Sequence, residues 1–303
     1  MKKLSFFICS IVVFGLIASA NADEELKVVG TLSTYSSLAE TIGGDAVETS
    51  SVASPRFNPH YIEARPSDIL RMKRADLFIH SGLDLEAWRG PLLDAVARAD
   101  LRNGGARQLD LSLGIPLLEV PSGQVSRSEG DIHQFGNPHY WTDPRNGLII
   151  AQAIESKLVE LLPEREAQFK KNLHDFRSQL EGKIVEWRAM IAPFRGAPVV
   201  SYHNEWPYLL NFLGLKPELF VEPKPGIPPG PQQLENLVAQ IRSGDVKVLL
   251  QATYSPEKAG EYLSEKTKIT VLSLCQNVGE REECPDYISM LDFDVRSLVK
   301  ALS

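Results

Sequence analysis

The stretch "EREAQFKKNLHDFRSQLEGKIVEWRAMIA" at residues 164–192 carries one unbroken helical pattern in the middle of the chain. Its apolar residues recur at helical spacing, at Phe169, Leu173, Phe176, Leu180, Ile184 and Trp187. Charged residues fill many of the other positions, and Pro193 ends the pattern. At 1.5 Å per residue such a helix is a rod of roughly 43 Å, long enough to run beside two lobes.

On both sides of this helix, short apolar or β-branched runs alternate with helical patterns, which is typical of α/β units with mainly parallel sheets. Four runs precede the helix and four follow it. The predicted strands cover residues 27–33, 47–54, 76–82, 107–114, 197–203, 216–221, 246–253 and 269–275. We therefore expect an α/β protein of two similar lobes, each a mainly parallel four-stranded sheet flanked by helices, joined by one long rigid linking helix.

The chain divides into four parts on this interpretation. They are a signal peptide at residues 1–22, an N-terminal lobe at 23–145, linking helices at 146–195 with the backbone helix at about 164–192, and a C-terminal lobe at 196–303. Because a rigid helix joins the lobes in place of flexible hinge strands, we expect little domain closure.

The N-terminal segment has the pattern of a secretory signal peptide. Lys2 and Lys3 precede an apolar run that is too short to span a bilayer comfortably, and alanines at alternate positions up to Ala22 fit a cleavage site. Cys9 lies inside the apolar run, without the small residues that surround a lipid-anchor cysteine. We expect a soluble, exported protein of the periplasm.

The charge balance limits the classes of partner. The chain has 32 Lys and Arg residues against 39 Asp and Glu residues, and removal of the signal peptide takes away two lysines and no acid. A negative balance argues against nucleic acid or an anionic membrane surface as the partner. We expect a monomer that tolerates cations.

Beyond the signal peptide the chain has two cysteines, Cys275 and Cys284. In an exported protein, a pair this close in sequence predicts a disulfide first and a thiolate metal ligand second.

A stiff extended loop is predicted at "EPKPGIPPGPQQL", residues 222–234, because proline fixes φ and has no N–H. A rigid surface connection is the ordinary interpretation of such a loop. A cleft wall or a docking loop for a partner is the functional alternative.

Three histidines occupy positions where ligand sites are built. His60 and His139 both stand in the tetrapeptide "NPHY", where proline keeps the preceding Asn extended, and a helix pattern begins a few residues later. His203 ends the predicted strand 197–203 and also precedes a helix pattern. In open parallel sheets, ligands bind beyond the carboxyl ends of the strands. Three convergent imidazoles resemble the ligand set of Zn²⁺ or a related ion.

The other three histidines have plainer interpretations. His174 lies beside the apolar stripe of the long helix and is expected at the surface. His80 is expected in the core or at its rim. His133 lies in the polar loop "SGQVSRSEGDIHQFG", where a solvated side chain is the default and a metal-capturing group is the alternative.

Three motifs together resemble a known family, the cluster A-I (TroA-like or ZnuA-like) solute-binding proteins of zinc and manganese ABC importers. They are "FNPHYIEARPSDILRMKRADLFIHSGLDLEAW" at 57–88, "GNPHYWTDPRN" at 136–146 and "SYHNEWPYLLNFLGL" at 201–215. The resemblance covers nearly all of the exported chain. It implies a periplasmic receptor that binds a divalent metal through His60, His139 and His203 and delivers it to a membrane permease. Histidine at the third position favours Zn²⁺, with Mn²⁺ as the alternative, because Mn²⁺ prefers oxygen ligands.

The chain departs from the family pattern at the fourth ligand. Family members usually supply an aspartate after the last strand, where this chain has "LSLCQNVG" and no acid. The fourth position is left to water, Cys275, Glu222 or Glu205. The loop at 122–135 also lacks the long run of His and Asp found in many zinc members, and has only Asp131 and His133.

Two other main functions compete with a metal receptor, and a secondary role as an adhesin or metal-dependent scaffold stays open. A three-histidine site with one open position also holds catalytic zinc, so a zinc hydrolase is one alternative, with Glu205 as its candidate general base. A receptor for an organic ligand on the same architecture is the other. We expect binding rather than catalysis, because no second catalytic group has a defined role.

Overall fold

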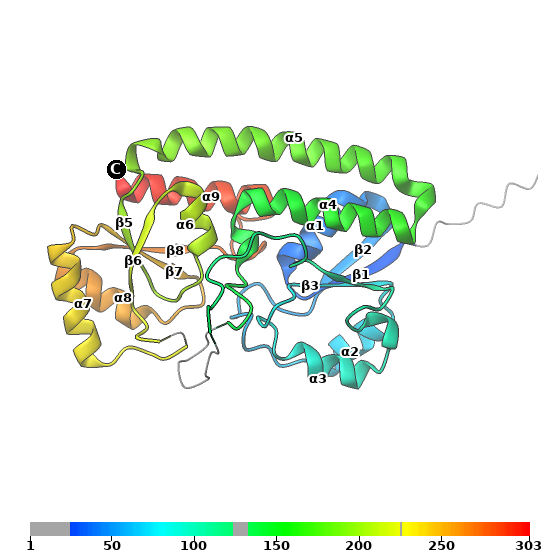
Figure 1. Ribbon diagram of the computed structural model, residues 1–303, viewed down its shortest axis with the longest axis horizontal. Helices are drawn as coiled ribbons and strands as arrows, with labels where there is room; N and C mark the ends of the chain where they lie inside the picture. Colours follow the sequence, from blue (N-terminus) through cyan, green and yellow to red (C-terminus); the bar gives the residue numbers. More distant parts are fainter. Residues whose placement is uncertain (1–24, 124–132, 225) are drawn as a thin grey trace, which may run out of the picture.

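The computed structural model describes residues 25–123, 133–224 and 226–303. The predicted signal peptide lies outside these residues. Figure 1 shows two α/β lobes side by side, with one long helix running along both of them. Within the described residues, no helix is both long and apolar enough to cross a membrane.

The N-terminal sheet has four parallel strands in the order β2-β1-β3-β4. They are β1 (Leu26–Gly30), β2 (Val47–Ser51), β3 (Leu77–His80) and β4 (Gln108–Asp110). All four residues of β3 are buried, as expected for an inner strand covered by helices on both faces.

The C-terminal sheet repeats this arrangement, with parallel strands in the order β6-β5-β7-β8. They are β5 (Pro198–Ser201), β6 (Lys216–Phe220), β7 (Val248–Ala252) and β8 (Thr270–Leu274). In each sheet the first strand in sequence pairs with the second on one side and the third on the other. The predicted α/β class, the two similar lobes and the four strands of each are therefore confirmed.

The helices begin where the sequence supplies suitable first residues. α4 starts at Pro144, and the side chain of Asp143 accepts a hydrogen bond from the Arg145 N–H. The other helices beside the sheets are α1 (Ser33–Gly43), α2 (Pro66–Lys73), α3 (Arg89–Val96), α6 (Pro207–Leu213), α7 (Pro231–Ser243), α8 (Glu257–Thr267) and α9 (Tyr287–Leu302), and α4 ends at Leu161. Short 3₁₀ turns cover Gly44–Ala46, Ala99–Leu101, Tyr140–Thr142, Pro163–Arg165 and Ala192–Phe194.

The linking helix is α5 (Glu166–Ile191). It contacts α1 and α4 in one half of the molecule and α6 and α9 in the other. Its predicted apolar stripe is buried from Phe169 to Trp187. The long linking helix is thus confirmed, whereas the lobe boundaries at 145 and 196 stay a prediction.

One hydrophobic core cluster extends through both lobes. It includes Val28 of β1, Phe169 and Trp187 of α5, Val199 of β5 and Leu298 of α9. Because the buried face of α5 belongs to this cluster, the relative position of the lobes is fixed by packing as well as by the chain connection.

Candidate metal centre

His60, His139 and His203 meet between the two lobes. One ring nitrogen of each histidine lies within 4.8 Å of the corresponding nitrogens of the other two. The Nε2 atoms of His60 and His139 are 3.2 Å apart. Ligands of a tetrahedral Zn²⁺ at the usual Zn–N distance are separated by about 3.3 Å. Three histidines that are far apart in the sequence therefore have the spacing of ligands to one ion.

The two "NPHY" segments fold in the same way. The side-chain Oδ1 of Asn58 accepts a hydrogen bond from the His60 N–H at 3.0 Å, and Asn137 does the same for His139 at 3.0 Å. This is an Asx turn, in which an asparagine side chain stabilises the backbone two residues later. In each tetrapeptide, the asparagine thus fixes the backbone conformation of the histidine whose ring lies in the site.

In two of the rings, the nitrogen that faces away from the site also has a hydrogen-bond partner. Nδ1 of His139 lies 3.0 Å from Asn137 Oδ1, and Nδ1 of His203 lies 2.7 Å from Glu222 Oε2. An oxygen acceptor at Nδ1 places the ring proton there and leaves the lone pair on Nε2. Metal-binding histidines usually have such a partner at the other nitrogen.

His60 and His139 are held in the neutral form that binds metal. Burial, followed by the neighbouring histidines, lowers the pKa of both His60 and His139 well below the ordinary value. Burial disfavours the charged imidazolium, and a second positive charge nearby disfavours it further. These two rings are therefore neutral at physiological pH.

The family assignment follows from comparison with known proteins. The family model for "ZnuA: Zinc-uptake complex component A periplasmic" matches residues 28–301. The chain belongs to this family. It is 24% identical to the iron-binding protein YfeA of Yersinia pestis, over 91% of this chain and 86% of YfeA. It is also 24% identical to the manganese ABC transporter substrate-binding lipoprotein PsaA of Streptococcus anginosus, over the whole of both.

The fold has a close match among solved structures of the family. A crystal structure of ZnuA aligns with a TM-score of 0.77 and 21% identity, over 92% of this chain and all of that one. As in the ZnuA family generally, this chain is a substrate-binding protein of a metal ABC importer.

The structure brings none of the three predicted fourth ligands into the group of metal-binding atoms. Glu222 supports His203 and also accepts a hydrogen bond from the Gly226 N–H at 2.8 Å. Glu205 accepts from the Ala252 N–H at 3.1 Å and from the Tyr254 hydroxyl at 3.4 Å. Burial raises the pKa of Glu205 to about 7. Among the described residues, the group within 4.8 Å consists of the three histidines alone.

The predicted disulfide is absent from the structure. Cys275 and Cys284 are buried free thiols whose sulfur atoms are 2.8 Å apart, whereas a disulfide bond is about 2.05 Å long. The Cys284 thiol donates a hydrogen bond to Cys275 instead. This contact, followed by burial, raises the pKa of Cys275, so the thiol stays protonated and is a poor metal ligand.

The remaining three histidines lie in three different environments. His174 is exposed on α5, as predicted. His80 is buried at the end of β3, where its ring contacts Gln108 and Arg89, and burial lowers its pKa to about 4. His133 lies beside the metal group, with its ring centre 5.2 Å from that of His60.

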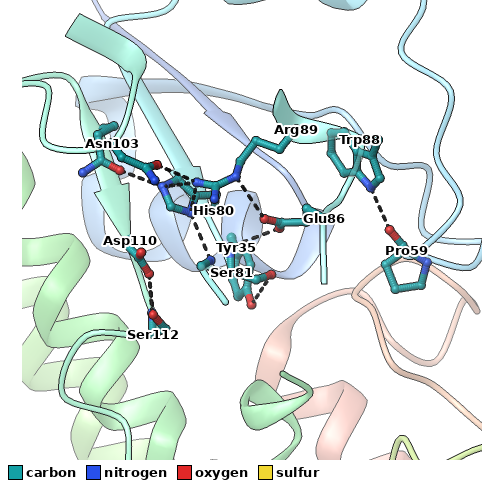
Figure 2. Close-up of polar contacts among 12 residues, drawn as sticks. Tyr35, Pro59, His80, Ser81, Glu86, Trp88, Arg89, Asn103, Asp110 and Ser112 are labelled. Atoms are coloured by element: carbon teal, nitrogen blue, oxygen red, sulfur yellow. Dashed lines mark hydrogen bonds and ion pairs between the residues drawn. The ribbon is translucent and has the colours of Figure 1, made fainter. Parts of the chain in front are cut away.

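A hydrogen bond that holds the His60 loop in place was not predicted from the sequence. Figure 2 shows Trp88 donating its indole N–H to the carbonyl of Pro59, at 2.8 Å. Nearby, the buried carboxylate of Glu86 accepts from the Ser81 N–H at 3.0 Å and faces Arg89. The "GLDLEAW" segment that ends the first family motif thus contributes Trp88, which holds the His60 loop through Pro59.

A cavity of about 610 Å³ opens beside the histidines on the side of the C-terminal lobe. His133 and His203 line it, and the first residues of the Pro-rich loop, Glu222 to Lys224, form part of its wall. The start of the loop is therefore part of a cleft wall, and its docking of a partner stays a prediction.

Proposed function

We propose that this protein is a high-affinity zinc receptor of an ABC importer in the periplasm. It binds one ion between the lobes through Nε2 of His60, His139 and His203 and delivers it to a membrane permease. The observation that carries the proposal is the group of three imidazoles whose ligand nitrogens lie within 4.8 Å of one another. The protein acts as a monomer and has no nucleic-acid partner.

The choice of zinc rests on the donor atoms. Nitrogen ligands suit Zn²⁺, whereas Mn²⁺ prefers carboxylate and carbonyl oxygens. The names of the relatives include iron and manganese, so family membership does not choose the ion. Manganese remains the alternative cargo, and a competition between the two ions separates the alternatives.

A zinc hydrolase has less support than a receptor. A carboxyl with a pKa of about 7, such as that of Glu205, could act as a general base. However, both oxygens of Glu205 face the buried groups of Ala252 and Tyr254, and the side chain has only 1% exposure. A substrate therefore has no access to this carboxylate.

Export with a cleaved signal peptide is part of the proposal. The relative from Streptococcus anginosus is named a lipoprotein, whereas Cys9 here lies within the apolar run. Mass spectrometry of the exported protein should give an N-terminus after Ala20 or Ala22. A lipid-modified Cys9 would show a lipoprotein instead.

Zinc titration against a chromophoric chelator tests the metal site. The purified protein should bind one zinc ion per chain and prefer it to manganese. His139→Ala should lower the zinc affinity by orders of magnitude, because it removes a buried ligand. His174→Ala, which changes an exposed histidine of α5, is the matched control. An unchanged affinity of His139→Ala would show that the metal binds elsewhere.

A further inference from the structure

The Nε2 atom of His133 is a buried nitrogen without a partner. Among the side chains that the structure describes, it is one of a few buried polar atoms that make no hydrogen bond. The side chain as a whole is 12% exposed. A buried acceptor is seldom left unpaired unless a ligand completes it.

The other nitrogen of this ring is fixed by an acid. Nδ1 of His133 lies 2.8 Å from Asp84 Oδ1, and Asp84 Oδ2 accepts a hydrogen bond from the Gln134 N–H at 2.9 Å. The carboxylate thus places the ring proton on Nδ1 and the lone pair on Nε2. His203 has the same arrangement with Glu222, and His139 has it with Asn137.

The ring of His133 is as near to the site as the three ligands are to one another. Its centre lies 5.2 Å from that of His60 and 6.0 Å from that of His139. The distances among the three ligand rings run from 5.2 to 6.0 Å. His133 and His203 also face the same cavity.

We propose that His133 is the fourth ligand of the metal and completes a tetrahedral site of four imidazoles. This inference rests on the proposed function. His133 is outside the group whose atoms lie within 4.8 Å, so its ring moves toward the ion when the ion binds. No helix or strand restrains the backbone at His133, which permits this movement.

Four imidazole ligands make a site of distinct selectivity. No carboxylate touches the ion, and each of the acids Asp84 and Glu222 acts through a ring. Such a site favours borderline ions such as Zn²⁺ and Co²⁺ over Mn²⁺, Mg²⁺ and Ca²⁺, which require oxygen ligands. The four ligands are also divided unevenly along the chain, since His60, His133 and His139 precede α5 and His203 follows it.

X-ray absorption of the zinc-loaded protein counts the imidazoles directly. The wild type should show four, and His133→Ala should show three imidazoles and one oxygen. The zinc affinity of His133→Ala should fall about 10- to 100-fold, and its preference for zinc over manganese should shrink. His174→Ala should match the wild type in each measurement.

A double-mutant cycle tests the role of Asp84 as a positioning residue. Asp84→Ala should weaken zinc binding about tenfold, because the ring of His133 loses its orientation. The double variant should bind no more weakly than His133→Ala alone, since Asp84 acts only through that ring. Equal melting temperatures of the metal-free variants would show that all of them fold.

The outcomes separate this inference from the proposed function. Three imidazoles in the wild type, with an unchanged affinity in His133→Ala, would overturn the fourth ligand and leave the zinc receptor standing. A wild type that binds no zinc would overturn the proposed function and the fourth ligand together.

Discussion

At the scale of single residues, each "NPHY" segment uses its asparagine side chain to fix the backbone of the histidine that follows it. The proline restriction and the position of each histidine before a helix could be predicted from local chemistry. The second function of Asn137, which also holds the His139 ring, could not, because it depends on the side-chain rotamer in the folded site. The same limit applied to His133, whose partner Asp84 is 49 positions away.

Asn137→Ala should weaken zinc binding about 10- to 100-fold. This change removes the acceptor of both the His139 N–H and its ring nitrogen. Asn58→Ala is the matched control, because Asn58 accepts from the His60 N–H in the same type of turn. The chelator titration should show a smaller loss for Asn58→Ala. Equal losses would mean that the turn, and not the ring contact, sets the affinity.

Zinc binding should persist to lower pH than ordinary imidazoles allow. Free histidines, with a pKa of about 6.5, would begin to exchange metal for protons below about pH 6. Burial lowers the pKa of His60 and His139 well below that value, so protons compete only at more acidic pH. Zinc affinity measured from pH 7.5 down to 4.5 should stay constant through pH 6. A decline that begins near pH 7 would contradict the neutral, buried cluster.

At the scale of elements, the turn between β8 and α9 is held by one buried acid. Glu280 accepts hydrogen bonds from the N–H groups of Gln276 and Asn277, at 3.1 and 2.7 Å, and from the Thr253 hydroxyl at 2.7 Å. The Gln276 carbonyl in turn accepts from the Trp141 indole at 2.7 Å. The Trp141 ring lies 5.5 Å from that of His139. This turn therefore supplies a supporting contact behind the metal site.

Glu280 should make the metal-free protein less stable as pH rises. Burial raises its pKa to about 7, so the folded state keeps a proton that the unfolded state releases above pH 4.5. The stabilisation is therefore complete below about pH 4.5 and is lost as pH rises through about 7. Denaturant midpoints at pH 5 and pH 7.5 should differ less in Glu280→Gln than in the wild type. Glu181→Gln, at an exposed position of α5, should leave the difference unchanged.

Elements were predicted better than the contacts between them. The spacing of apolar residues gave α5 and all eight strands, because both patterns are local. The polar network around Glu86 and the turn held by Glu280 join residues through tertiary contacts, which no local pattern reports. The predicted disulfide failed for the same reason, since two nearby cysteines specify closeness and not a bond.

At the scale of the whole molecule, α5 makes the two lobes one structural unit. Trp187 is fully buried in the shared core, and its indole donates to Asp292 of α9 at 2.9 Å. The helix therefore connects the sheets through packing and through polar contacts at the C-terminal lobe.

Trp187→Ala should destabilise the whole protein by about 3–5 kcal/mol, because it leaves a cavity in that core. Near-UV and far-UV circular dichroism should report one coincident unfolding transition in the wild type and in the variant. Val185→Ala is the control, since Val185 lies on the same helix and is 71% exposed. Two separate transitions would show that the lobes unfold independently.

Zinc should raise the free energy of unfolding, because it binds only the folded site. At a free concentration one hundred times the Kd, the gain is about 2.7 kcal/mol. The gain should disappear with excess chelator and in His139→Ala. A melting temperature that does not respond to zinc would contradict a site formed between the lobes.

The packing of α5 into a core shared by both lobes also has a consequence for the rate of transport. We expect little change of shape on loading, so that the receptor presents nearly the same surface to its permease whether or not it carries an ion. Empty receptors should then compete with loaded ones for the importer, so that excess empty protein inhibits uptake. The cell would have to match the amount of receptor to the supply of metal.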